Sequence, residues 1–172
     1  EDRELDVRGP RMLQGVRHGF LADAQEIVLD HRGHPPRPAL DARTDPAIQA
    51  GAQLLGHALG HQETILYNQD GEVTEAAACN VFVVRNGIVA TPLLDHQKLP
   101  GVTRLMLLEI LRRDGSIPVQ ERVVTMRELA QADEVWLTSS SKEIAPVVEI
   151  DGCPVGDGRP GTLFRRMHAL YQ

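Results

Sequence analysis

The sequence of 172 residues is poor in cysteine and has no long apolar run, and each shortage argues against a class of protein. Cys79 and Cys153 are its only cysteines, so a disulfide scaffold is excluded and a reducing, cytoplasmic setting is expected. No apolar run approaches the roughly 20 residues of a membrane-spanning helix, and the charged opening EDRELDVRGPRM is not a signal peptide. The net charge of −6 argues against nucleic acid or an anionic membrane as partner.

Several common catalytic motifs are also missing. The sequence has no GxGxxG dinucleotide loop, no GxxxxGK[ST] phosphate loop and no GxSxG nucleophile turn. His57 and His61 have the i, i+4 spacing of zinc ligands on a helix, but no third ligand is evident, so we expect no metal. Lysine is scarce as well, because only Lys98 and Lys142 occur in the chain.

What is present predicts an α+β fold. Asp70-Gly71, Asn86-Gly87 and Asp151-Gly152 each separate two strand-like runs, which is typical of β-hairpins. Hairpins require antiparallel pairing, so we expect an antiparallel or mixed sheet or pseudo-barrel with packed helices. Apolar periodicity predicts the helices 46–59, 101–113, 125–132 and 161–172, and the strands 119–124 and 134–141.

The composition, 42% hydrophobic, predicts one packed domain over 1–172. Residues 1–45 are a poorly defined N-terminal segment, and the clearly predicted helices and strands lie in 46–172. The sequence has no internal repeat and no low-complexity segment that would indicate a second domain.

Two polar features lie at predicted element ends, where an anion is bound most easily. Gly101, Val102 and Thr103 open the helix 101–113, and the free N–H groups of a helix start favour a phosphate. Ser139 and Ser140 follow a buried strand, and together the two ends are able to cradle one phosphate. An ordinary capped turn and a polar loop are the alternatives for these two segments.

Glu75 ends a hairpin strand and is followed by the small residues Ala76, Ala77 and Ala78. Small side chains allow a flat ligand to approach closely, so the carboxylate is a candidate ligand contact. The alternative is a solvated carboxylate at the end of a strand, the usual state of glutamate.

Four segments, read in order, resemble the class IV (fold type IV) pyridoxal-phosphate aminotransferases. D-amino-acid transaminase is the most similar member, and branched-chain aminotransferase and aminodeoxychorismate lyase are relatives. The resemblance covers about 63–164. Its segments are GEVTEAAACNVFVV (71–84), NGIVATPLLDHQKLPGVTR (86–104), ADEVWLTSSSKEIAPVVEIDG (132–152) and PVGDGRPG (154–161).

The resemblance implies a function and a role for each candidate residue. It implies amino transfer between a D-amino or branched-chain amino acid and a 2-oxo acid through pyridoxal phosphate. Since a missing domain would leave apolar surface bare, we also expect a homodimer or larger assembly. Glu75 matches the carboxylate that pairs with the pyridine nitrogen, which fits its chemistry. Leu99 matches the residue packed on the ring face. Phosphate contacts are implied for Gly101, Val102, Thr103, Ser139 and Ser140.

The chain departs from the family at the catalytic lysine, which carries the cofactor through its amine. Arg43, in PALDARTDPAIQAG (38–51), stands about where that lysine belongs, with Asp41 and Thr44 fitting the local pattern. Arginine stays charged and is no amine nucleophile. Lys98 and Lys142 fall at positions without a lysine role in the family.

The chain is also too short for the family's N-terminal domain, and the family's GSSSN is AAACN here. Three readings follow: the cofactor-binding half of a transaminase, a lysine-less homologue that binds a ligand or does other chemistry, and a structural or partner subunit. An enzyme similar to aminodeoxychorismate lyase is a further alternative. Fold similarity alone does not choose among them.

Overall fold

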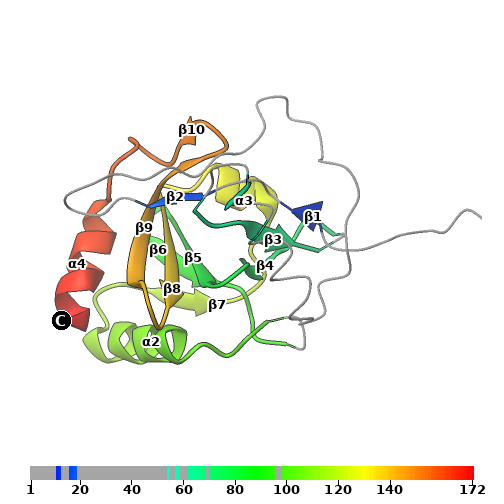
Figure 1. Cartoon of the computed structure of the whole chain (residues 1–172). Coiled ribbons are helices and arrows are strands. Elements are labelled where there is room, and N and C mark those ends of the chain that lie inside the picture. The colour runs from blue at the N-terminus through cyan, green and yellow to red at the C-terminus, as the bar shows by residue number, and fades with distance from the viewer. Residues whose placement is uncertain are drawn as a thin grey trace, which may run out of the picture.

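The computed structural model describes residues 11–12, 16–18, 54, 57–58, 62–68, 70–95 and 98–172. Within these ranges the strands form two sheets (Figure 1). The smaller sheet has the order β1-β3-β4, and the larger has the order β10-β9-β8-β5-β6-β7, with β2 paired to β9. The strands are β1 (Arg11–Met12), β2 (Val16–His18), β3 (Ile65–Tyr67), β4 (Val73–Ala76), β5 (Asn80–Arg85), β6 (Ile88–Thr91), β7 (Val119–Glu121), β8 (Glu134–Ser139), β9 (Glu143–Ile150) and β10 (Cys153–Pro154).

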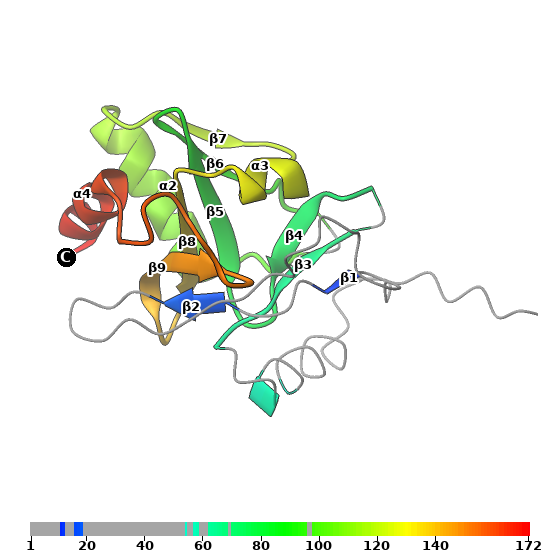
Figure 2. The same cartoon turned by 90° about the horizontal axis from the view of Figure 1, so that it is seen from above.

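The larger sheet is mixed, since β6 and β7 run parallel while its other described pairs are antiparallel. The described helices are α2 (Val102–Asp114), α3 (Met126–Ala130) and α4 (Thr162–Tyr171). Figure 2 shows α2 and α4 together on one side of the larger sheet, with the β3–β4 hairpin on the other. The predicted α+β fold with a mixed sheet is confirmed. Among the described helices, none is long and apolar enough to cross a membrane.

Both faces of the larger sheet are buried along its central strands β5, β6, β8 and β9, which explains their near-continuous apolar sequences. In β5, Phe82 and Val84 pack on the helix side with Trp136 of β8. The alternate residues Val81 and Val83 belong to the other core cluster, which includes β3, β4 and α3. The sheet is therefore the central layer, and its strand ends are where polar side chains reach a cavity.

The glycine-marked turns form as predicted. Asn86 and Gly87 have φ of 52° and 76°, and Asp151 and Gly152 have 48° and 75°. Positive φ at both central residues is the two-residue hairpin turn that matches strand twist. At the end of α2, Gly115 is left-handed with φ of 67° and its N–H bonds to the carbonyl of Leu111.

The turn between β8 and β9 differs from the sequence prediction. The strand expected over 134–141 ends at Ser139, and β9 starts at Glu143, opposite Ser139 in the ladder. The strand expected over 119–124 is the shorter β7. Antiparallel pairing with β8 decides where β9 starts, and it leaves a tight turn of polar residues between the two strands. Of the predicted helix 46–59, Leu54, His57 and Ala58 are described, and all three are helical.

Candidate functional site

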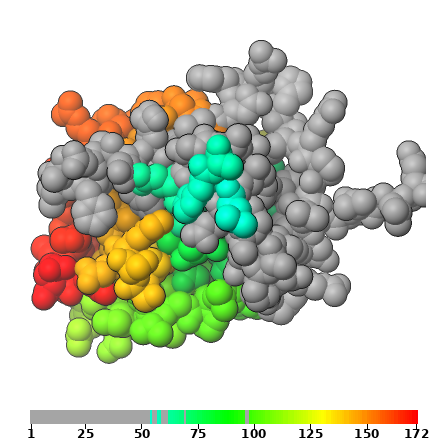
Figure 3. Space-filling model, viewed as in Figure 1, coloured from blue at the N-terminus to red at the C-terminus, as the bar shows by residue number. Residues whose placement is uncertain are grey.

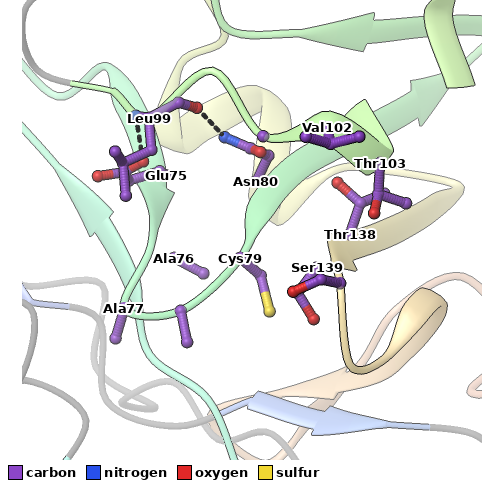
Figure 4. Close-up of a pocket in the computed structure, with 13 residues that line it drawn as sticks. Glu75, Ala76, Ala77, Cys79, Asn80, Leu99, Val102, Thr103, Thr138 and Ser139 are labelled. Atoms are coloured by element: carbon purple, nitrogen blue, oxygen red, sulfur yellow. Dashed lines mark hydrogen bonds between the residues drawn. The ribbon is translucent and has the colours of Figure 1, made fainter. Parts of the chain in front are cut away.

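A cavity of about 250 Å³ opens where β4, β5, β8 and the start of α2 meet. Figure 4 shows Glu75 and Leu99 at one end and Thr103, Thr138 and Ser139 at the other. Between them lies a wall of small side chains. The lining residues are Glu75, Ala76, Ala77, Ala78, Cys79, Asn80, Leu99, Gly101, Val102, Thr103, Thr138, Ser139 and Ser140.

The carboxylate end is built by the last residues of β4. Glu75 is 4% exposed, and its Oε2 accepts a hydrogen bond of 2.9 Å from the backbone N–H of Leu99. The carbonyl of Leu99 accepts 2.9 Å from Asn80 Nδ2, so the Leu99 backbone is held on both sides. The Leu99 side chain is exposed. A buried carboxylate at this place favours a cationic partner group.

The opposite end is the start of α2. Gly101 is the N-cap, has no side chain to cap the helix, and no acidic residue lies in the first turn. A Cβ on Gly101 would lie 2.1 Å from Asn80 Oδ1, so a larger residue here would displace the Asn80 side chain, which donates to the Leu99 carbonyl. Thr103 is 6% exposed, while Val102 is exposed. The helix start thus presents amides and a hydroxyl to the cavity, as an anion requires.

Hydroxyls of β8 and the following turn complete that end. Thr138 is 1% exposed, and its Oγ1 has no hydrogen-bond partner among the described residues. Ser139 Oγ accepts 3.1 Å from the backbone N–H of Lys142, and Ser140 is exposed at the rim. A buried hydroxyl without a partner is costly, and a bound polar group would remove that cost.

The structure brings together all the predicted cofactor contacts that it describes. Glu75, Leu99, Gly101, Val102, Thr103, Ser139 and Ser140 line one cavity, although they come from three distant segments. Arg43 lies outside the described residues.

Sequence reasoning missed Cys79, Asn80 and Thr138 as lining residues. Asn80 and Thr138 are partners in the β5–β8 ladder, and such a pairing has no local signal. Of the three, only Thr138 had a sequence signal, because it is a hydroxyl-bearing residue within an otherwise apolar strand.

Cys79 is not a nucleophile in this state. Burial, followed by the charge of Glu63, raises the pKa of its thiol to about 12, while Lys142 and a hydrogen bond from Ser139 oppose the shift. The thiol therefore stays protonated at neutral pH, and the thiolate is the reactive form. Cys79 contributes a small side chain to the cavity wall.

Neither lysine of the chain lines the cavity. Lys98 Nζ pairs with Asp95 Oδ2 at 2.5 Å, and Lys142 Nζ pairs with Glu63 Oε2 at 3.0 Å. Within the described ranges, no group of three or more His, Cys, Asp or Glu side chains is placed to hold a metal ion, and His61 lies outside those ranges.

Comparison with curated proteins finds similar chains among aminotransferases. The chain is 37% identical over 112 residues to a probable branched-chain-amino-acid aminotransferase of Aquifex aeolicus, covering 65% of this chain and 36% of that protein. It is 34% identical over 170 residues to D-alanine aminotransferase of Listeria monocytogenes, covering 92% of this chain and 57% of that protein. The chain therefore spans between about a third and somewhat over half of these two relatives.

A solved aminotransferase structure is similar to this chain as well. The branched-chain amino acid aminotransferase of Thermobaculum terrenum, in its PLP form, superposes with a TM-score of 0.69 and 29% identity. That match covers 84% of this chain and 47% of the other. The family described as amino-transferase class IV matches residues 24–150, well over half of the chain. On its sequence, its fold and this match, the chain belongs to the class IV aminotransferase family.

Proposed function

We propose that the chain binds pyridoxal 5′-phosphate in this cavity and serves an aminotransferase that moves amino groups between an amino acid and a 2-oxo acid. The observation that carries the proposal is the pairing of an anion-binding end with a buried carboxylate across one cavity (Figure 4). The amides of α2 and the unpartnered Thr138 hydroxyl suit a phosphate. Glu75, at the far end, suits a protonated ring nitrogen.

When bound, pyridoxal phosphate supplies an electron sink for reactions at the substrate α-carbon. In this proposal Glu75 keeps a proton on the pyridine nitrogen, because an ionised carboxylate favours the cationic form of its partner. Leu99 covers one face of the ring. Gly101, Val102, Thr103, Ser139 and Ser140 hold the phosphate.

The proposal extends to substrate, assembly and setting. Its relatives' names support D-alanine or a branched-chain amino acid as donor. We propose a single domain with 46–172 as the cofactor-binding part, and a cytoplasmic homodimer. The exposed Leu93, Leu99, Val102, Leu105 and Met106, which cluster along 93–106, support an assembly that covers apolar surface.

A second candidate is a homologue that binds the cofactor without transamination. It is favoured by one observation: neither Lys98 nor Lys142 lines the cavity, and both are ion-paired. Arg43 remains charged at working pH and is a poor proton shuttle. In this candidate the chain binds pyridoxal phosphate weakly and reversibly, with little turnover.

Titration of the pure chain with pyridoxal phosphate, followed by visible absorption, tests binding. We expect a saturable change that weakens at least tenfold in Thr103→Val, whose hydroxyl lies in the cavity. A wild-type chain without saturable binding would overturn the cofactor proposal.

Covalent attachment and turnover separate the two candidates. Borohydride reduction and mass spectrometry should detect no fixed cofactor on the unmodified chain and attachment in Arg43→Lys. Arg85→Lys, a substitution outside the cavity, is the matched control. Robust transamination of D-alanine or a branched-chain amino acid by the unmodified chain would overturn the second candidate.

A further inference from the structure

Glu63 is a buried carboxylate behind the small-residue wall of the cavity, and its side chain is 0% exposed. Its Oε1 accepts from the backbone N–H groups of Ala78 at 3.2 Å and Thr64 at 3.3 Å. Its Oε2 accepts from Cys79 Sγ at 3.2 Å and from Lys142 Nζ at 3.0 Å. Four donors match the acceptor capacity of an ionised carboxylate, and only Lys142 among them carries the opposite charge.

Donors of Glu63 come from two segments that each supply lining residues to the cavity. Ala78 and Cys79 belong to the segment between β4 and β5, whereas Lys142 lies in the turn between β8 and β9. Figure 3 shows this turn at the surface near α2, and the Lys142 side chain is 30% exposed. The ion pair therefore joins residues 79 positions apart in sequence and ties a surface turn to an interior wall.

Lys142 also contacts a cavity-lining residue, Ser139, through its backbone. Its N–H donates 3.1 Å to Ser139 Oγ, which occupies a lone pair of that oxygen and restricts the orientation of the hydroxyl. Ser141 Oγ lies 3.4 Å from the same oxygen, a longer and weaker contact. One residue thus anchors the turn through its ammonium group and orients a cavity hydroxyl through its amide.

We infer that the Glu63–Lys142 ion pair is a clasp that fixes the two cavity walls relative to each other, and that Lys142 is a positioning residue for the anion-binding hydroxyl of Ser139. Without the ammonium group, Glu63 is a buried charge without a counter-charge, which is strongly unfavourable. The wall then opens to admit water, and Cys79 and Ser139 move apart. The part of the inference that concerns the anion rests on the proposed function.

The test compares Lys142→Met with Arg122→Met in the full chain. Arg122 is the matched control because it forms an ion pair of 2.5 Å with Glu128 between other elements and does not line the cavity. Hydrogen exchange of the Ala78 amide, measured without ligand, reports on the wall. Affinity for pyridoxal phosphate reports on the site.

We expect Lys142→Met to speed Ala78 exchange and to weaken pyridoxal phosphate binding, each by about tenfold. Lys142→Arg should restore both, since it keeps the charge, and Arg122→Met should change neither by more than twofold after correction for global unfolding. If Lys142→Met folds poorly, Lys142→Gln, which still donates to Glu63, should show the same directions at smaller size.

Unchanged Ala78 exchange in Lys142→Met would overturn the clasp, and so would equal changes in Arg122→Met. If exchange rises while affinity stays within twofold, the role of Lys142 in positioning Ser139 is wrong. A wild-type chain that binds no pyridoxal phosphate contradicts the proposed function instead, and the exchange measurement still decides whether the clasp exists.

Discussion

The two long helices, α2 and α4, start alike in sequence and differ in what satisfies their first N–H groups. Each follows a glycine N-cap, Gly101 or Gly161, with no side-chain cap and no acidic residue in the first turn. At α4 the missing acceptor comes from β8. Glu134 accepts 2.9 Å from the N–H of Leu163 and 2.7 Å from that of Phe164. A carboxylate of the chain itself neutralises the positive end of α4.

At the start of α2 the arrangement is different. The hydrogen bonds among the described residues include no side-chain acceptor for the N–H of Val102 or Thr103, and the helix start lines the cavity. Thr138 lies four residues after Glu134 on the same strand. Its buried hydroxyl has no hydrogen-bond partner among the described residues. β8 therefore lies beside both helix starts. It supplies the Glu134 carboxylate to α4 and the Thr138 hydroxyl to the cavity at α2. The comparison supports the proposal that an anionic ligand fills, at α2, the place that Glu134 takes at α4.

Removing Glu134 should have the largest effect. In Glu134→Ala the two α4 amides and Trp136 Nε1, which donates 3.0 Å to Glu134 Oε2, lose their acceptor. We expect the free energy of unfolding to fall by about 3 kcal/mol, the sum of a lost helix cap and charged hydrogen bonds. Urea denaturation followed by Trp136 fluorescence measures this. Ligand affinity of the folded variant should stay within twofold, and a loss of binding would contradict the separation of the two helix starts.

Paired glycine substitutions test the same contrast at the two N-caps. A Cβ at Gly101 meets Asn80 Oδ1 at 2.1 Å, and a Cβ at Gly161 meets Glu134 Oε1 at 2.1 Å. Both positions have negative φ, so the penalty is steric, of about 1–3 kcal/mol in stability. Gly101→Ala should also weaken pyridoxal phosphate binding by about tenfold, close to 1.4 kcal/mol. Gly161→Ala should not, as isothermal titration would show. Equal affinity losses in both variants would point to a general distortion.

The turns and helix ends of this fold, which depend on neighbouring residues, were predictable from the sequence. Asn86-Gly87 and Asp151-Gly152 specify tight turns through their positive φ, and Gly115 ends α2 in the expected way. Thr103 and Ser139 were found as candidates because each lies at an element end where N–H groups or hydroxyls bind an anion, with an ordinary cap or polar turn as the alternative. These features depend on a few consecutive residues, and propensity captures them.

The remaining features depend on contacts that sequence patterns do not encode. Glu134 caps a helix that starts 28 residues later, and its role is invisible until β8 is placed beside α4. Glu63 resembles any carboxylate before a strand, and only the fold puts it under Lys142. Thr138 becomes a cavity residue through pairing with Asn80. Contacts between residues far apart in sequence decide all three cases.

Thr138→Val should give opposite signs for stability and binding. Without ligand, the substitution removes a buried hydroxyl that has no partner among the described residues, so the free energy of unfolding should stay equal or rise slightly. With pyridoxal phosphate, one hydrogen bond is lost, and affinity should fall about fivefold, close to 1 kcal/mol. Thermal unfolding with and without ligand measures both. Thr74→Val, which removes another unpartnered buried hydroxyl outside the cavity, is the matched control for affinity. A destabilised ligand-free Thr138→Val would show that the hydroxyl already has a partner.

Ser140→Ala should have the smallest effect at the start of α2. Ser140 lines the cavity but is exposed, so water competes for its hydroxyl and little is gained when a ligand replaces that water. We expect affinity for pyridoxal phosphate to fall by about twofold, near 0.4 kcal/mol, with no change in the urea midpoint. Ser141→Ala, in the same turn and outside the lining set, is the control and should leave affinity unchanged. A tenfold loss in Ser140→Ala would mean that the turn closes over the ligand and buries this hydroxyl. The anion site at the start of α2 would then be covered by β8 and its turn, as the start of α4 is covered by Glu134.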